Sequence, residues 1–331
     1  MLKMAIKVLL KYMEDFHFSP SFNFFALVLL LFSFFMFSKL TKSNKHKLPP
    51  SPPKLPIIGN LHQLGSLPHR SFGALSDKYG RLLLVHMGQS PVLVVSSHEI
   101  VREIMKTHDT IFANRHKTGA ADVLFYGGNE LVFSPHGEHW REVRKVYVSE
   151  LLSQKRLQLF HLNRKRQVKI MVAKIRRSYD SGQVPVNLGE MLHSILIIIL
   201  CEFAFGGQYG GDEYGKKFGR LSQSISKLLL AFSFREFFPF IGWMDKFTGF
   251  DARLGKTWKE VNAFLDQVIK EHEDTMTSKS EKSEVKDCVD VLLNLRNNGM
   301  AGIDLSLDVI KGIILLGQIS NLNVLSLLNN A

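Results

Sequence analysis

The feature that most constrains this chain is an uncharged apolar run near its N-terminus, from Phe22 to Phe37. A helix that crosses the hydrocarbon core of a bilayer needs about 20 predominantly apolar residues. The run is slightly shorter than that, and residues 19–21 can extend it because they carry no charge. We therefore predict a transmembrane anchor over residues 21–38, preceded by an N-terminal leader of residues 1–20.

A cleaved signal peptide is the alternative for the same run, because three lysines within residues 3–11 would form its basic flank. Against cleavage, no small-x-small pattern ends the run, and four lysines follow at once within residues 39–47. Positive charge beside a span tends to stay in the cytoplasm. We therefore expect a retained anchor, with the bulk of the chain facing the cytosol.

A proline-rich stretch, LPPSPPKLP, follows at residues 48–56. Proline fixes its own φ angle and lacks a backbone donor, so this stretch favours a stiff, extended connector. A ligand for an SH3-type domain is the alternative use of such a sequence. Its place between the anchor and the rest of the chain favours a basic, proline-rich hinge over residues 39–56.

Beyond the hinge, helical periodicity predominates. A short helix is predicted first, and then two strands, residues 81–87 and 91–95, which form a hairpin. Ser96 and Glu99 have the spacing of a capping box, which predicts a helix over residues 98–106.

The strongest amphipathic segment comes later in the chain, and its apolar stripe consists of Leu254, Trp258, Val261, Leu265, Val268 and Ile269. We predict that this stripe faces a hydrophobic core. A mainly α domain with one small β element fits neither an alternating βαβ enzyme nor a β-sandwich.

Composition limits the chemistry. The only cysteines are Cys201 and Cys288, which excludes a disulfide framework or a metal cluster built on several thiolates. The net charge of +12 would attract nucleic acid, an anionic membrane or an acidic protein. The basic residues within 164–177 belong to no known nucleic-acid module and resemble the solvated face of a long helix. We therefore predict no nucleic-acid partner.

One segment has the spacing of a nucleotide-binding loop, from Gly210 to Lys216. Such a loop needs Ser or Thr after its lysine to hold magnesium, and Lys217 stands there. Asp212 and Glu213 would also place negative charge among the amides that bind phosphate. A glycine-rich surface loop between helices is the favoured interpretation, and a phosphate-loop protein stays an alternative function.

The segment WREVRK places Trp140 and Arg144 four residues apart, on one face of a predicted helix. An indole donor beside a guanidinium can anchor a carboxylate. A buried Trp flanked by a surface Arg is the alternative. His136 and His139 just before this pair lack a third ligand for a metal site, and a polar helix start explains them better.

Four segments follow the anchor in a characteristic order: LPPSPPKLPIIGNLHQLG, RLLLVHMGQSPVLVVSS, FANRH and WREVRK. This order resembles the plant microsomal cytochrome P450 family. The resemblance covers residues 20–316, and its motifs become less specific toward the C-terminal end of that range. The resemblance implies a mainly α, P450-like helical fold with a small β-sheet, incomplete at its C-terminal side, within residues 57–316. Residues 317–331 diverge from the family pattern.

By this resemblance, Trp140 and Arg144 would bind the haem propionates, with Arg115 as a further candidate. Residues 117–133 would correspond to the variable loop beside the substrate pocket, and residues 218–240 to the segment over its roof. The candidate pocket residues in the loop are Leu124, Phe125 and Phe133.

The resemblance also implies an activity. The family inserts one oxygen atom of O2 into a small apolar substrate at a haem whose iron carries a cysteinate, with electrons from NADPH through a reductase. Such proteins are expected at the endoplasmic reticulum membrane. The family's cysteine lies in a Phe-x-x-Gly-x-Arg-x-Cys-x-Gly loop, which is missing from these 331 residues.

Without that loop, we assign no catalytic residue and no metal ligand, and we predict that Cys201 and Cys288 are packing residues. The chain itself is then expected to be inactive. A non-catalytic, membrane-tethered interaction fragment is the alternative.

Overall fold

The computed structural model describes residues 20–40, 48–182, 185–278, 286–299 and 305–315. The chain divides into two compact units, Met1–Pro50 and Ser51–Ala331.

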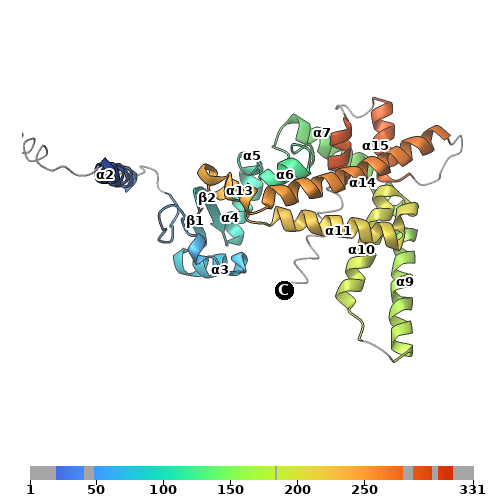
Figure 1. Ribbon diagram of the computed structural model, residues 1–331. Helices are drawn as coiled ribbons and strands as arrows, with labels where there is room; N and C mark the ends of the chain where they lie inside the picture. The colour runs from blue at the N-terminus through green and yellow to red at the C-terminus, as the bar shows by residue number, and fades with distance from the viewer. Residues whose placement is uncertain (1–19, 41–47, 183–184, 279–285, 300–304, 316–331) are drawn as a thin grey trace, which may run out of the picture. The chain divides into compact units, whose positions relative to one another are not determined.

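In the described part of the first unit, residues 20–40 form helix α2 (Pro20–Leu40, Figure 1), which includes the predicted anchor, residues 21–38. At 1.5 Å per residue, its 21 residues span about 31 Å, close to the thickness of a bilayer core. The side chains described in it, residues 24–33 and 35, are all exposed. A helix that is apolar all round is typical of a membrane span. The predicted leader lies outside the described residues except for Pro20, which begins α2.

The second unit begins with helix α3 (Pro68–Tyr79) and an antiparallel hairpin of β1 (Leu82–Met87) and β2 (Ser90–Val95). The predicted hairpin is thus confirmed to within one residue at each strand start. Its turn requires Gly88, since φ is +62° and a Cβ atom would lie 2.3 Å from the carbonyl oxygen of Phe237.

Helix α4 (His98–Arg102) and the π-helical segment η2 (Glu103–Thr107) confirm the predicted helix, but its cap differs from the prediction. Ser97, not Ser96, accepts the hydrogen bond from the amide of Ile100 and also bonds to Glu99. The Ser96 hydroxyl bonds to that of Ser76, at 2.7 Å. The predicted capping residue was therefore wrong by one position, because a contact with α3 uses Ser96.

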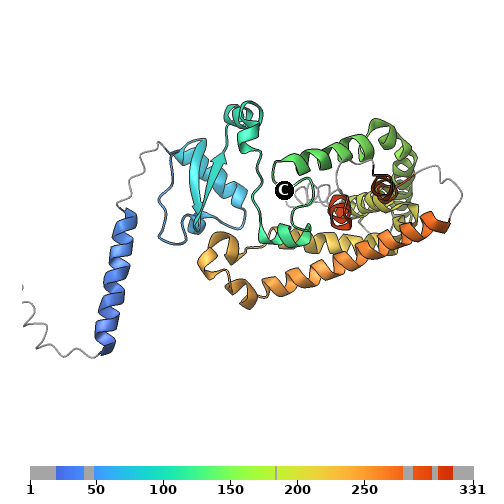
Figure 2. The ribbon, with the colours of Figure 1, turned by 90° about the horizontal axis from the view of Figure 1, so that it is seen from above.

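The rest of the unit is helical (Figures 1 and 2). Its further elements are α5 (Asp109–Phe112), α6 (Gly119–Leu124), α7 (Glu138–Val146), η3 (Tyr147–Leu151), α8 (Gln154–Leu159), α9 (His161–Asp180), α10 (Leu188–Phe205), η4 (Gly207–Gly210), α11 (Asp212–Leu229), α12 (Phe234–Phe237), η5 (Pro239–Ile241), α13 (Met244–Phe247), α14 (Phe250–Ser278), α15 (Cys288–Asn297) and a helical stretch over residues 307–315.

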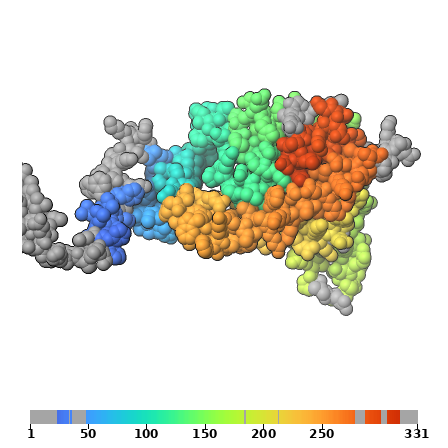
Figure 3. Space-filling view, turned by 45° about the horizontal axis from the view of Figure 1, so that its top comes forward, coloured from blue at the N-terminus to red at the C-terminus, as the bar shows by residue number. Residues whose placement is uncertain are grey.

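The hydrophobic core lies among α10, α11, α14, α15 and residues 307–315. Helices α11 and α14 run side by side, and α14 forms a continuous band on the surface beside α15 (Figure 3). The predicted stripe of α14 is confirmed, since five of its members are buried and Trp258 packs against them half-buried. Phe205 is fully enclosed, and its ring contacts those of Tyr209, Phe218 and Phe264.

The glycine-rich segment after α10 is not the surface loop that we predicted. Helix α11 starts at Asp212, so residues 212–216 of the alternative phosphate-loop segment are helical. Gly210 packs directly against Glu202, because a Cβ atom there would lie 2.4 Å from the Glu202 carboxylate. A carboxylate at this position opposes phosphate binding.

Candidate functional site

The Trp140 and Arg144 side chains lie together on α7, as their spacing predicted. Val143 and Val146 point into the core and fix the orientation of the helix. The guanidinium carbon of Arg144 then lies 5.6 Å from the centroid of the half-buried Trp140 ring. At this distance, the face of the indole attracts the cation.

A turn over residues 131–133 brings the third predicted residue, Arg115, to the same place. The Trp140 Nε1–H group donates to the carbonyl of Leu131 at 2.9 Å. Arg115 donates from Nε to the carbonyl of Val132 at 3.1 Å, and from Nη1 to that of Ala113 at 2.8 Å. Two donors that are far apart in sequence thus meet on consecutive carbonyls. We call Arg115, this turn, Trp140 and Arg144 the anchoring edge.

The two arginines of the anchoring edge are exposed. Within the described parts of the chain, neither forms an ion pair with a carboxylate. A guanidinium has five N–H donors, so Arg115 keeps unused donors after its two backbone bonds. Such a set is suited to an incoming carboxylate, which forms strong charge-assisted hydrogen bonds with guanidinium groups.

The turn itself is held by a buried carboxylate that sequence reasoning missed. Glu130 is fully enclosed, and its two oxygens accept hydrogen bonds from the amides of Val132 and Phe133. Burial raises the pKa of Glu130, and these amide bonds oppose the rise. The sequence signal was a carboxylate two and three residues before the amides that it caps, a local pattern typical of acidic residues in turns.

The predicted pocket residues lie just behind this turn. Leu124 and Phe125 are fully enclosed, and the ring of Phe133 stacks on that of Phe125 at 5.2 Å. The cavity beside Phe133, also lined by Thr118 and Gly128, measures about 10 Å³. That volume suits a single water molecule. A role for these three side chains in substrate binding stays a prediction.

Both cysteines are buried, as predicted. Burial, with a smaller contribution from Glu202, raises the pKa of the Cys201 thiol to about 12, and burial also raises that of Cys288. Both are therefore protonated at neutral pH, whereas a metal ligand must be a thiolate. The anchoring edge fits the carboxylates of a haem, but these two cysteines do not fit its iron.

One buried ion pair, His272 with Asp287, was also missed from the sequence, as was one in which a buried lysine, Lys311, pairs with an exposed carboxylate. His272 directs Nδ1 at the carbonyl of Val268, at 2.7 Å, and Nε2 at the carboxylate of Asp287, at 3.0 Å. Only a protonated imidazole can donate to both. Burial alone would lower the pKa of His272, but these partners outweigh it and raise the pKa to about 9. Lys311 pairs with Asp266 at 2.6 Å.

His272, Asp287 and Asp290 also form the one described group of side chains that could hold a metal ion, with ligand atoms within 4.8 Å of one another. Both carboxylates already form the capping box of α15. A hydrogen bond from the protonated His272 ring to Asp287 explains why these groups lie close together without a metal.

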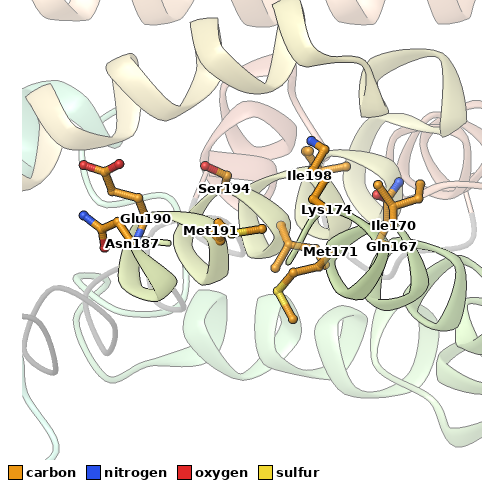
Figure 4. A pocket seen from close by; sticks show the side chains of 10 residues that line it. Gln167, Ile170, Met171, Lys174, Asn187, Glu190, Met191, Ser194 and Ile198 are labelled. Carbon is orange, nitrogen blue, oxygen red and sulfur yellow. Dashed lines mark hydrogen bonds between the residues drawn. The ribbon is translucent and has the colours of Figure 1, made fainter. Parts of the chain in front are cut away.

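A pocket of about 290 Å³ lies between α9 and α10 (Figure 4). Its lining mixes apolar side chains such as Met171 and Met191 with the polar Gln167 and Glu190. It shares no residue with the anchoring edge. Helix α10 is also long and apolar enough to cross a membrane, whereas the stretch of α2 that passes the same test of composition is the shorter Phe24–Ser33. The packing of α10 against α9, α11 and α15 identifies it as a core helix.

Comparisons with known proteins show which family this chain resembles in sequence and fold. The sequence model of the family described as Cytochrome P450 matches residues 49–315. The chain is 42% identical over 304 residues to a phenylacetaldehyde oxime monooxygenase of Prunus mume, covering 89% of this chain and 57% of that protein. It is 39% identical over 300 residues to a norfluorocurarine oxidase of Strychnos, covering 88% of this chain and 59% of that protein.

Cytochrome P450 71A9 of Glycine max is 42% identical over 299 residues, with 89% of this chain and 59% of that protein covered. A solved zebrafish cytochrome P450, described with progesterone, superimposes with a TM-score of 0.56 at 21% identity, over 76% of this chain and 55% of the other. The structural likeness concerns the fold alone. The chain spans less than two thirds of the length of these relatives.

Proposed function

The chain belongs to the cytochrome P450 family, and from this premise we propose that its second unit is the haem-anchoring part of a monooxygenase. When bound, the haem would supply the chemistry that inserts one oxygen atom of O2 into a small apolar substrate, with electrons from NADPH through a reductase. The role of this chain would be to bind the haem by its propionate groups and thereby to orient it.

The observation that carries the proposal is the anchoring edge. Trp140 and Arg115 converge on one turn, and Arg144 lies against the Trp140 ring. Neither arginine forms an ion pair with a carboxylate among the described residues, so their exposed guanidinium groups are available to the two propionates. Trp140 would share its N–H between the Leu131 carbonyl and a propionate oxygen.

We further propose that a polypeptide of these 331 residues does not activate oxygen by itself. Its only cysteines are buried thiols with raised pKa values, so neither provides the cysteinate that the family's iron requires. The membrane-tethered interaction fragment stays the alternative. A nucleotide-binding role is disfavoured, because Glu202 occupies the space beside Gly210.

We place the protein at the endoplasmic reticulum membrane, with α2 as a single span and the second unit in the cytosol. The length and apolar character of α2 support this proposal. In the second unit, a set of exposed aromatic side chains could add contact with the lipid surface: Phe232, Phe240, Trp243 and Phe247.

The proposal is tested by titrating the purified full-length chain, in one detergent, with haem and with haem dimethyl ester. The ester has the same ring and iron but no free carboxylates. We expect haem to bind at least about tenfold more tightly, because each charge-assisted bond contributes about 1.5–3 kcal/mol. Equal affinities for the two compounds would refute recognition of the propionates by the anchoring edge.

A further inference from the structure

Glu130 occupies an unusual position for an acidic residue, because its side chain is fully buried and faces no cation at ion-pair distance within the described residues. Its oxygen Oε2 accepts from the amide of Val132, and Oε1 from the amide of Phe133, both at 2.5 Å. A buried carboxylate is costly unless donors satisfy it. Here, two backbone amides of the turn do so.

The same turn carries the acceptors of the anchoring edge. Val132 uses its amide for Glu130 and its carbonyl for Arg115, so a single peptide segment links the carboxylate to the guanidinium. The neighbouring carbonyl, of Leu131, accepts from Trp140. The orientation of both donors therefore depends on the conformation that Glu130 imposes on this turn.

The surroundings hold Glu130 itself in place. A Cβ atom on Gly312, in the helical stretch 307–315, would lie 3.4 Å from the Glu130 Cβ and from the Asn129 carbonyl oxygen. The Asn129 side chain donates to the carbonyl of Tyr126 at 2.7 Å. On the other side of the turn, Phe133 stacks on Phe125. The carboxylate thus has a rigid base from which to hold the two amides.

We propose that Glu130 is the positioning residue of the anchoring edge: its carboxylate caps the turn and thereby orients Trp140 and Arg115 toward one carboxylate-bearing ligand. The ligand class rests on the proposed function. Glu130 does not touch the ligand; it acts through the carbonyls of Leu131 and Val132.

The test follows Trp140 directly in the full-length chain. The protein contains three tryptophans, Trp140, Trp243 and Trp258, so labelling with ¹⁵N-tryptophan gives three indole N–H signals. Single Trp→Phe variants assign them. Glu130→Gln keeps the side-chain volume but replaces one acceptor by a donor, which opposes one of the two amides. Glu130→Ala removes both acceptors.

In both variants, we expect the Trp140 signal to shift and its indole N–H to exchange with solvent about fivefold faster, as the loss of one ordinary hydrogen bond predicts. The signals of Trp243 and Trp258 should stay in place. Glu202→Gln is the matched control, since Glu202 is also a buried carboxylate but binds Arg166 and Gln167 on α9.

An unchanged Trp140 signal in both Glu130 variants would overturn the proposal. So would an equal change at all three tryptophans, or an equal change at Trp140 in the Glu202 control, because either result would show a general loss of structure. This measurement needs no haem. If Trp140 responds as expected while haem and its dimethyl ester bind equally, only the proposed function fails.

Discussion

The helical core and the anchoring edge differ in how they treat charge. In the core, three buried charged groups form ion pairs within the chain: Glu202 with Arg166, His272 with Asp287, and Lys311 with Asp266. At the edge, Arg115 and Arg144 are exposed and form no ion pair with a carboxylate among the described residues, although Arg115 lies close enough to lower the pKa of Glu130. We infer that the core charges stabilise the fold and that the edge charges serve a ligand.

This difference leads to different expectations for mutations. A substitution in the core should lower the free energy of unfolding, since it removes packing or leaves a buried partner unsatisfied. A substitution of an arginine at the edge should change ligand affinity and leave stability nearly unchanged.

The largest effect is expected for Phe205→Ala. The Phe205 ring is 0% exposed and contacts three other aromatic rings, so its removal should leave a cavity and cost about 3–5 kcal/mol of unfolding free energy. Phe247, 81% exposed, is the control, and Phe247→Ala should cost less than about 0.5 kcal/mol. Urea unfolding followed by circular dichroism measures both. Similar costs would show that the core is not packed as described.

The next effect concerns pH. The pKa of His272 is raised from 6.5 to about 9, so its contribution is fully present below pH 6.5 and is lost as the pH rises through about 9. The corresponding loss is about 3 kcal/mol of unfolding free energy, at 1.36 kcal/mol per pKa unit. The urea concentration at the midpoint of unfolding should therefore fall as the pH rises from 6.5 to 9.5.

His272→Gln cannot carry the charge, so its stability should depend less on pH over this window. The difference between the two proteins isolates His272 from the cysteines, which titrate in the unfolded chain over a similar range. An identical pH dependence in the variant would mean that His272 is not the charged partner of Asp287.

The smallest effect on stability is expected at the edge. Arg144→Ala should change the unfolding free energy by less than about 0.5 kcal/mol, yet weaken haem binding by about tenfold or more. Arg141, exposed on the same helix but not at the Trp140 ring, is the matched control. The contrast between core and edge would fail if Arg144→Ala unfolded the protein, or if both variants bound haem equally.

The sequence allowed prediction of the features that depend on local periodicity. The hairpin, the apolar stripe of α14 and the shared face of Trp140 and Arg144 follow from the spacing of residues along a strand or a helix. The cap of α4 was misplaced, because Ser96 and Ser97 are equivalent locally and only the contact of Ser96 with Ser76 distinguishes them. The start of α11 was missed because glycines near 210 favour a loop locally, whereas close packing against Glu202 needs one of them.

The remaining features depend on contacts between distant segments. Nothing near His272 in the sequence shows that Asp287 will accept a hydrogen bond from its ring, and nothing near Lys311 indicates that it will pair with Asp266. The convergence of Arg115 and Trp140 on one turn likewise required the fold, although the family resemblance had named both residues. Glu130 lies close to the turn in sequence, but its importance appears only when the acceptors of the two donors are known.

We propose that this chain offers anchors for the haem propionates but that neither of its two buried cysteines supplies a thiolate for the iron. The most direct test is the carbon-monoxide difference spectrum of the full-length chain after reconstitution with haem and reduction. We predict no Soret band of the thiolate type, because Cys201 and Cys288 are buried thiols. A clear thiolate band that disappears in a Cys201→Ser or Cys288→Ser variant would contradict this account.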